Sequence, residues 1–133
     1  MFIYFPLYLL TMVNRVLQPQ EIEVYYLLPA IRRELTVCMK AQGKTQKEIA
    51  RLLGVTEPAI SQYMTEKRAT DVKFPKGIKA EIKLAAEKIK NQETLYSEVQ
   101  RILLLCRKAR LICRVHEMLG LPPKNCSACF KRK

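Results

Sequence analysis

Four of the chain's five cysteines and its only histidine lie in one stretch near the C-terminus, CRKARLICRVHEMLGLPPKNCSAC, residues 106–129. Thiolates and imidazole are ligands that zinc prefers, and four thiolates commonly anchor an iron–sulfur cluster. The two-residue spacing between Cys126 and Cys129 is typical of metal ligands, and the preceding proline pair ends a helix and lets the tail fold back over it. This segment indicates a metal site, and paired disulfides or plain buried or free thiols are the alternatives.

The spacing of the two cysteines upstream of Cys126 distinguishes two possible sets of metal ligands. On an unbroken helix, Cys106 and Cys113 share a face but lie about 10.5 Å apart along the axis, whereas two sulfur ligands of one zinc ion lie only about 3.8 Å apart. An iron–sulfur cluster is wider, and we expect it to be held by Cys106, Cys113, Cys126 and Cys129. The alternative is a Cys₃His zinc site with the ligands Cys113, His116, Cys126 and Cys129, which leaves Cys106 in the core.

Some of these cysteines and the histidine have simpler explanations than metal binding, and catalysis has less support in the sequence. Cys38 lies on the apolar stripe of an earlier helix, which predicts a core position. His116 is as well explained by packing as by metal binding. No oxyanion donor or orienting carboxylate can be placed beside a Cys–His pair, and the chain has no phosphate-binding loop or nucleophile elbow. We therefore expect no enzyme, no catalytic residue and no small-molecule substrate.

Composition favours a polyanionic partner. The 133 residues suit about one domain. Lys and Arg number 24 against 12 Asp and Glu, for a net charge of +12. Residues 1–75 carry 10 basic and 7 acidic side chains, whereas residues 76–133 carry the other 14 and 5, so most of the excess is C-terminal. This balance suits nucleic acid or an anionic surface.

An apolar run, MFIYFPLYLLTMV, opens the sequence. It is shorter than the roughly 20 residues that a spanning helix needs, and it has neither a basic start nor a cleavage site, so we expect no membrane anchor, no signal peptide and a cytoplasmic protein. Met12 leads into an ordinary soluble start, so residues 1–11 are interpreted as an extension of the true start, or else as an arm that packs on a partner. Residues 1–26 are assigned to an N-terminal arm.

Apolar spacing predicts that the elements positioning these groups are helices. Past Pro29, apolar residues recur at steps of three and four until Gly43 ends the pattern, and no segment alternates as a strand would. In the next segment, KTQKEIARLLGVTEPAISQYMTEKR, Thr45 and Glu48 form a capping box, and Gly54 permits a sharp turn before a second short helix. We expect an all-α protein that contains a helix-turn-helix.

This segment resembles the helix-turn-helix of Cro/repressor-type (XRE-family) transcription regulators over about residues 27–70. The matching positions are the small Ala50, the turn glycine Gly54 and the apolar Val55, Ile60 and Tyr63. The wider arrangement, with cysteines behind the motif, is similar to a group of small archaeal predicted regulators. The resemblance implies double-stranded DNA as the partner.

In this motif the second helix enters the major groove and the first crosses the backbone. The side chains expected at bases are Thr56, Glu57, Ser61, Gln62 and Thr65, and those expected at phosphates are Lys44, Gln46, Lys47, Lys67 and Arg68. Gln62 can bond an adenine and Glu57 can accept from a cytosine, although a carboxylate there can also repel phosphate.

Residues 71–77 are expected to link this domain to a helical, cysteine-bearing dimerisation and metal-binding region, residues 78–133. Its apolar stripe comprises Leu95, Val99, Ile102, Cys106, Ala109, Cys113 and His116. Such a stripe suits pairing across a homodimer, and packing within the chain is the alternative.

These observations predict a dimeric, sequence-specific transcription regulator that responds to redox state or metal. A non-specific DNA- or RNA-binding protein and a protein-interaction adaptor built on a metal knuckle stay open as alternatives.

Overall fold

The computed structural model describes residues 16–65, 72–122 and 125–130. Within these ranges every regular element is a helix, so the prediction of an all-α protein is confirmed. In chain order the elements are α2 (Pro19–Ile22), the π-helical turn η1 (Glu23–Leu27), α3 (Leu28–Ala41), α4 (Gln46–Leu53), α5 (Glu57–Thr65), α6 (Lys76–Lys88), α7 (Gln92–Lys108), α8 (Leu111–Met118) and the 3₁₀ turn η2 (Ala128–Phe130). None of the described helices is long and apolar enough to span a membrane.

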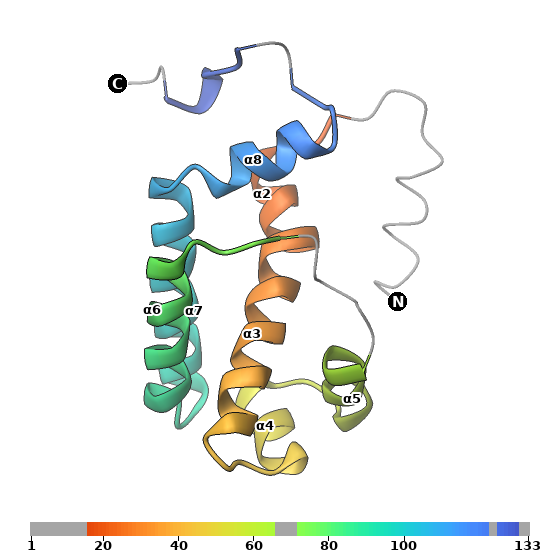
Figure 1. The fold of residues 1–133 in the computed structure, drawn as a ribbon, viewed down its shortest axis with the longest axis vertical. Helices are drawn as coiled ribbons and strands as arrows, with labels where there is room; N and C mark the ends of the chain where they lie inside the picture. Colours follow the sequence, from red (N-terminus) through yellow and green to blue (C-terminus); the bar gives the residue numbers. More distant parts are fainter. Residues whose placement is uncertain (1–15, 66–71, 123–124, 131–133) are drawn as a thin grey trace.

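One long helical rod, formed by α2, η1 and α3, runs through the middle of the fold (Figure 1). It starts at Pro19, inside the range that the sequence assigns to an N-terminal arm. The Glu21 carboxylate accepts a hydrogen bond from the Gln18 amide at 2.9 Å and so closes the first turn. Because Leu17 and Ile22 are buried, this early part of the chain belongs to the core.

The π-helical turn explains how the rod continues past a proline. Pro29 lacks an amide hydrogen, and its ring would clash with the carbonyl one turn earlier in a regular helix. In η1 the amide of Leu28 instead donates to the carbonyl of Glu23, five residues back, which widens the helix just before the proline. The sequence predicted a helix that begins near Pro29, whereas the structure places Pro29 near the start of α3 within a longer rod.

The remaining helices pack around α3 as one body. The α6 helix covers one side of α3, and α4 and α5 lie against the end where α3 finishes (Figure 1). The α7 helix packs on α6 and also reaches α4, while α8 crosses near α2 at the opposite end of the rod. A single hydrophobic core therefore joins the expected helix-turn-helix region to the expected C-terminal region.

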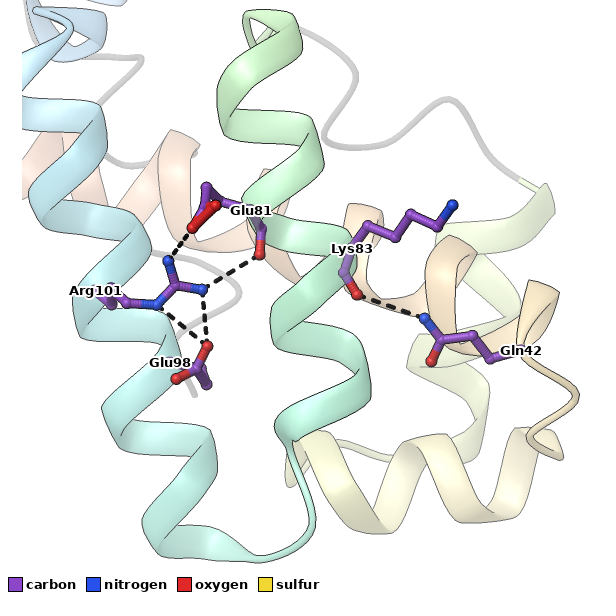
Figure 2. Close-up of polar contacts among 5 residues, drawn as sticks. All are labelled: Gln42, Glu81, Lys83, Glu98 and Arg101. Carbon is purple, nitrogen blue, oxygen red and sulfur yellow. Dashed lines mark hydrogen bonds and ion pairs between the residues drawn. The ribbon is translucent and has the colours of Figure 1, made fainter.

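Polar contacts fix the α6–α7 pair against α3. The Arg101 guanidinium on α7 donates to the Glu98 carboxylate at 2.8 Å and also binds the Glu81 carboxylate on α6 (Figure 2). On the other side of α6, the Gln42 amide at the end of α3 donates to the carbonyl of Lys83 at 3.5 Å. These contacts hold three helices at a set spacing.

A break separates α7 from α8. Arg110 adopts a left-handed backbone with φ of 56°, a conformation that a side chain other than glycine or asparagine rarely takes. Cys106 and Cys113 therefore do not share the unbroken helix that the sequence suggested. The described structure shows Ile102 and Cys106 fully buried in the chain's own core.

An ion pair ties the rod to the end of α7. Glu23, in the π-helical turn, is only 7% exposed, and its carboxylate accepts two hydrogen bonds from Arg107, at 2.9 and 3.1 Å. This two-pronged geometry satisfies a carboxylate that burial would otherwise destabilise.

Candidate nucleic-acid interface

Local hydrogen bonds define the start of α4. The Thr45 hydroxyl oxygen accepts from the amide of Glu48 at 3.2 Å, which satisfies one free donor of the first turn. The Glu48 carboxylate accepts from the Thr45 hydroxyl, also at 3.2 Å. Half of the predicted capping box is therefore present: Thr45 caps the helix, but the Glu48 carboxylate binds the Thr45 hydroxyl instead of the Thr45 backbone amide.

Gly54 ends α4 in the left-handed conformation, with φ of 67°. Its amide and the amide of Val55 both donate to the carbonyl of Ala50, the latter at 3.0 Å, which closes the helix end. Val55 then packs partly buried against the core, and Ile60 on the next helix is fully buried. The turn therefore sets the angle between α4 and α5.

The α5 helix begins with its own cap. The Thr56 hydroxyl oxygen accepts from the amide of Ala59 at 3.2 Å, and Pro58 sits in the first turn, where its missing amide hydrogen costs nothing. Glu57 is exposed at the positive end of the helix dipole, which favours a negative charge there. This gives Glu57 a structural reason for its position besides base reading.

Gln46 joins the two helices of the motif. Its side-chain amide nitrogen donates to the Ser61 hydroxyl at 2.6 Å and to the backbone carbonyl of Glu57 at 3.0 Å. The sequence predicted a phosphate contact for Gln46 and a base contact for Ser61. In the structure the first residue of α4 holds the exposed edge of α5.

The described residues expected at DNA belong to α4, to α5 and to the segments just before these helices, at one end of the molecule (Figure 1). Exposed positions are Lys47, Thr56, Glu57, Ser61 and Thr65, and half-buried positions are Lys44, Gln46 and Gln62. Lys67 and Arg68 lie outside the described residues. Arg51, one turn after Lys47 on α4, is also exposed and adds a basic group that the sequence analysis missed, although its spacing from Lys47 was the available signal.

The cysteine-bearing end lies at the other end of the rod. Cys113, His116, Cys126 and Cys129 all line one cavity of about 190 Å³, together with Leu17 and its neighbours at the start of α2. Cys106 does not line this cavity, since it is fully buried in the core beside Glu23. Three of the four predicted cysteine ligands and the alternative ligand His116 thus share a cavity.

The surroundings of Cys106 and of Cys113 raise the pKa of each thiol, but through different neighbours. Burial, and then the nearby Glu23, raise the pKa of Cys106 to about 11, which disfavours the thiolate that a metal needs. Burial also raises the pKa of Cys113, and Cys129 and Cys126 raise it further while Arg110 lowers it. The three outer thiols are therefore close enough for their charges to interact.

In the part of the chain that the structure describes, no three Cys, His, Asp or Glu side chains are already arranged to hold a metal ion. All five cysteines are free thiols. Any metal at this end would therefore have to draw the exposed Cys126–Cys129 turn toward α8.

A comparison with known families identifies the motif. Residues 38–74 match a family model described as Helix-turn-helix, which is of the XRE type, and the match covers about a quarter of the chain. The predicted resemblance is confirmed for this segment, which is an XRE-type helix-turn-helix. No curated protein and no solved structure matches the chain.

Proposed function

We propose that this protein is a sequence-specific transcription regulator that reads DNA with the first turns of α5. The observation that carries the proposal is the contact between Gln46 and the exposed edge of α5. Two hydrogen bonds from one side chain, to Ser61 and to the carbonyl of Glu57, hold that edge in a fixed orientation. A helix that is held rigidly and exposes polar groups at its start fits the major groove.

The chemistry of the neighbouring residues supports this orientation. The exposed hydroxyl of Ser61 can pair with either a donor or an acceptor on a base, and Gln62 can bond an adenine. Lys47 and Arg51 on α4 are exposed cations that suit phosphates, which fix register without reading sequence. Gln46 would act as a positioning residue, because it acts on DNA through Ser61.

The test begins with selection of bound duplexes from a random pool. On the selected site, Ser61→Ala and Gln62→Ala should each lose discrimination at one base pair, by about 1–3 kcal/mol. Lys47→Ala should weaken all duplexes equally and lower the salt slope by about 1. Lys90→Ala, at an exposed position between α6 and α7, is the matched control and should leave selectivity unchanged. A pool without enrichment would contradict the proposal.

A dimer is the second part of the proposal. Helix-turn-helix proteins read two-fold sites as dimers. Much of the predicted apolar stripe is used inside the chain, but the outward face of α7 exposes Tyr96 by 61% and Leu104 by 48%, two turns apart. Sedimentation equilibrium should give a dimer that Leu104→Glu dissociates, while Val37→Glu, at an exposed apolar position on α3, should not.

Non-specific binding by the basic C-terminal half is the competing function. Exposed lysines of α6 favour it, and α6 lies on the other side of α3 from α5 (Figure 1). If Lys79→Ala and Lys83→Ala weaken binding more than Lys47→Ala, and random DNA competes as well as the selected site, this second function is supported instead.

The third part of the proposal is a response to metal or redox state at the cysteine-bearing end. An iron–sulfur cluster on four cysteines would require Cys106 to leave a fully buried position. The cavity shared by the other three cysteines and His116 supports a different ligand set.

A further inference from the structure

We infer that Cys113, His116, Cys126 and Cys129 bind a single zinc ion that fastens the C-terminal tail to α8 and to the start of α2. This inference deepens the metal-responsive part of the proposed function, and it rests on that function only for its effect on DNA binding. The metal site itself stands on the residues that line one cavity.

The two pairs of ligands come from short local patterns. Cys113 and His116 are three residues apart on α8, so both side chains point to the same face of the helix. Cys126 lies just before the η2 turn and Cys129 lies within it, a spacing that lets both sulfurs reach one ion. The chain thus presents one pair on a helix and the other on a turn, as tetrahedral zinc sites commonly do.

Both pairs line one cavity, although no three of the described side chains are yet grouped around a single ion position. All four side chains line the same hollow of about 190 Å³, and Val16, Leu17 and Pro19 form its wall on the α2 side. Cys126 and Cys129 are exposed, so their turn can shift toward α8 without breaking core packing. Cys106 is excluded from this set because it is fully buried elsewhere.

The surroundings suit the charge of the site. Zinc binding releases three protons, one from each thiol, so Zn²⁺ with three thiolates and a neutral imidazole carries a net charge of −1. A second hollow that touches Cys113 and Cys129 is also lined by the paired side chains Glu23 and Arg107 and by Arg110. These three charged side chains carry a net charge of +1, which attracts the net charge of −1 on the occupied site.

The ligand set distinguishes zinc from an iron–sulfur cluster. Three thiolates and one imidazole in a closed tetrahedral site are a common set for structural zinc, whereas most clusters take four cysteines. Only three of the described cysteines line the cavity. A structural zinc here would fix the tail beside residues 16–19, at the end of the rod opposite α4.

The experiment measures metal in the full chain purified without air. Elemental analysis should give one zinc per chain, colourless protein and no sulfide. X-ray absorption should give three sulfur ligands at about 2.3 Å and one nitrogen at about 2.0–2.1 Å. Cys126→Ser and His116→Ala should each lower zinc occupancy, whereas Cys38→Ser and Cys106→Ala, the matched cysteine controls, should keep it.

Two results would overturn the inference. One is coloured protein with iron and sulfide whose cluster is lost in Cys106→Ala, and the other is metal-free protein in which the outer thiols form disulfides. Because a variant can fail to fold, cobalt is also titrated into wild-type chain stripped of metal, where tetrahedral thiolate spectra should appear at one equivalent. No such spectrum would also reject the site.

DNA binding is measured in a separate experiment. With zinc bound and then removed, affinity for the selected site should fall and the thermal midpoint should drop. If zinc binds with the predicted ligands but no DNA is selected, the regulator proposal fails while the metal site stands. If DNA is selected but no zinc binds, the metal site fails alone.

Discussion

The buried Glu23 carboxylate depends on its ion pair with Arg107. The Glu23 side chain is 10% exposed, while the Arg107 side chain that binds it is 49% exposed. Such a pair adds little net stability when both groups are present, but a buried carboxylate left without its partner is costly.

Arg107→Ala should therefore destabilise the protein by about 1–3 kcal/mol, measured by urea unfolding. The double variant Glu23→Leu/Arg107→Leu should recover most of that loss, since no charge is then left buried. Equal instability of the single and double variants would show that Arg107 acts through packing instead.

Cys106 gives a pH prediction. Its pKa is raised from 9.0 to about 11 in the folded protein, so between these values the unfolded chain has lost the proton and the folded chain still holds it. The unfolded state then binds fewer protons, and stability should fall as pH rises through this window, by about 2 kcal/mol from this thiol. Below pH 9 the contribution is fully present.

Urea unfolding of reduced protein across this window checks the slope. Cys106→Ala should lose less stability between pH 9 and 11 than the wild type, whatever its stability at neutral pH. In alkylation at neutral pH, the exposed Cys126 and Cys129 should react and Cys106 should not. Rapid labelling of Cys106 would mean that the core opens readily.

For single residues, the sequence predicted local helix caps better than contacts between residues far apart in the chain. Local spacing predicted the Thr45 cap, because its bond to the Glu48 amide spans only three residues. The bond from Gln46 to Ser61 spans fifteen residues and depends on the angle at Gly54, so no local pattern contains it. Burial of Cys106 depends equally on packing against the distant Glu23.

Among the helical elements, two glycines offer a matched test. Gly54 has φ of 67° and Gly77 lies in α6 without a positive φ, and a Cβ at either position would meet no atom within 4 Å. Gly54→Ala should thus cost about 1–2 kcal/mol through backbone strain alone, and Gly54→Asn should cost less. Gly77→Ala should stabilise by about 0.5–1 kcal/mol.

Thermal unfolding of the three variants gives the comparison. Opposite signs for the two alanine variants would support the left-handed turn after α4. A neutral Gly54→Ala would mean that the turn relaxes, and the fixed angle between α4 and α5 would then lose its basis.

The element order from α3 to α7 follows the predicted periodicity, but two boundaries do not. Apolar steps of three and four continue across Ala109 and Arg110, and arginine gives no signal for a left-handed break. The rod before Pro29 was missed because proline commonly marks a helix start, and the π-helical turn that accommodates it has no simple sequence pattern.

For the whole molecule, one core connects the motif to the C-terminal helices. The α6 helix packs along α3. There burial raises the pKa of the Cys38 thiol, while the positive charges of Lys83 and Lys79 on α6 lower it. The Gln42 side chain also donates a hydrogen bond to the Lys83 carbonyl on α6. A fragment that ends at Pro75 should therefore lack a cooperative thermal transition, because this side of α3 would be exposed.

Circular dichroism and amide NMR dispersion measure the outcome, and a chain lacking only residues 131–133 is the control. A fragment that melts cooperatively would instead show that the helix-turn-helix region folds without α6 and α7. The sequence could not settle this point, because an apolar stripe predicts that a helix is covered but not by which neighbour.

The continuous helix from Pro19 to Ala41 has a mechanical consequence. At 1.5 Å per residue it is about 35 Å long, and its ends touch the cysteine-lined cavity and the support of α5, respectively. A rigid helix of this length couples its two ends, so a displacement of Pro19 at the cavity would also tilt the end on which α4 and α5 pack.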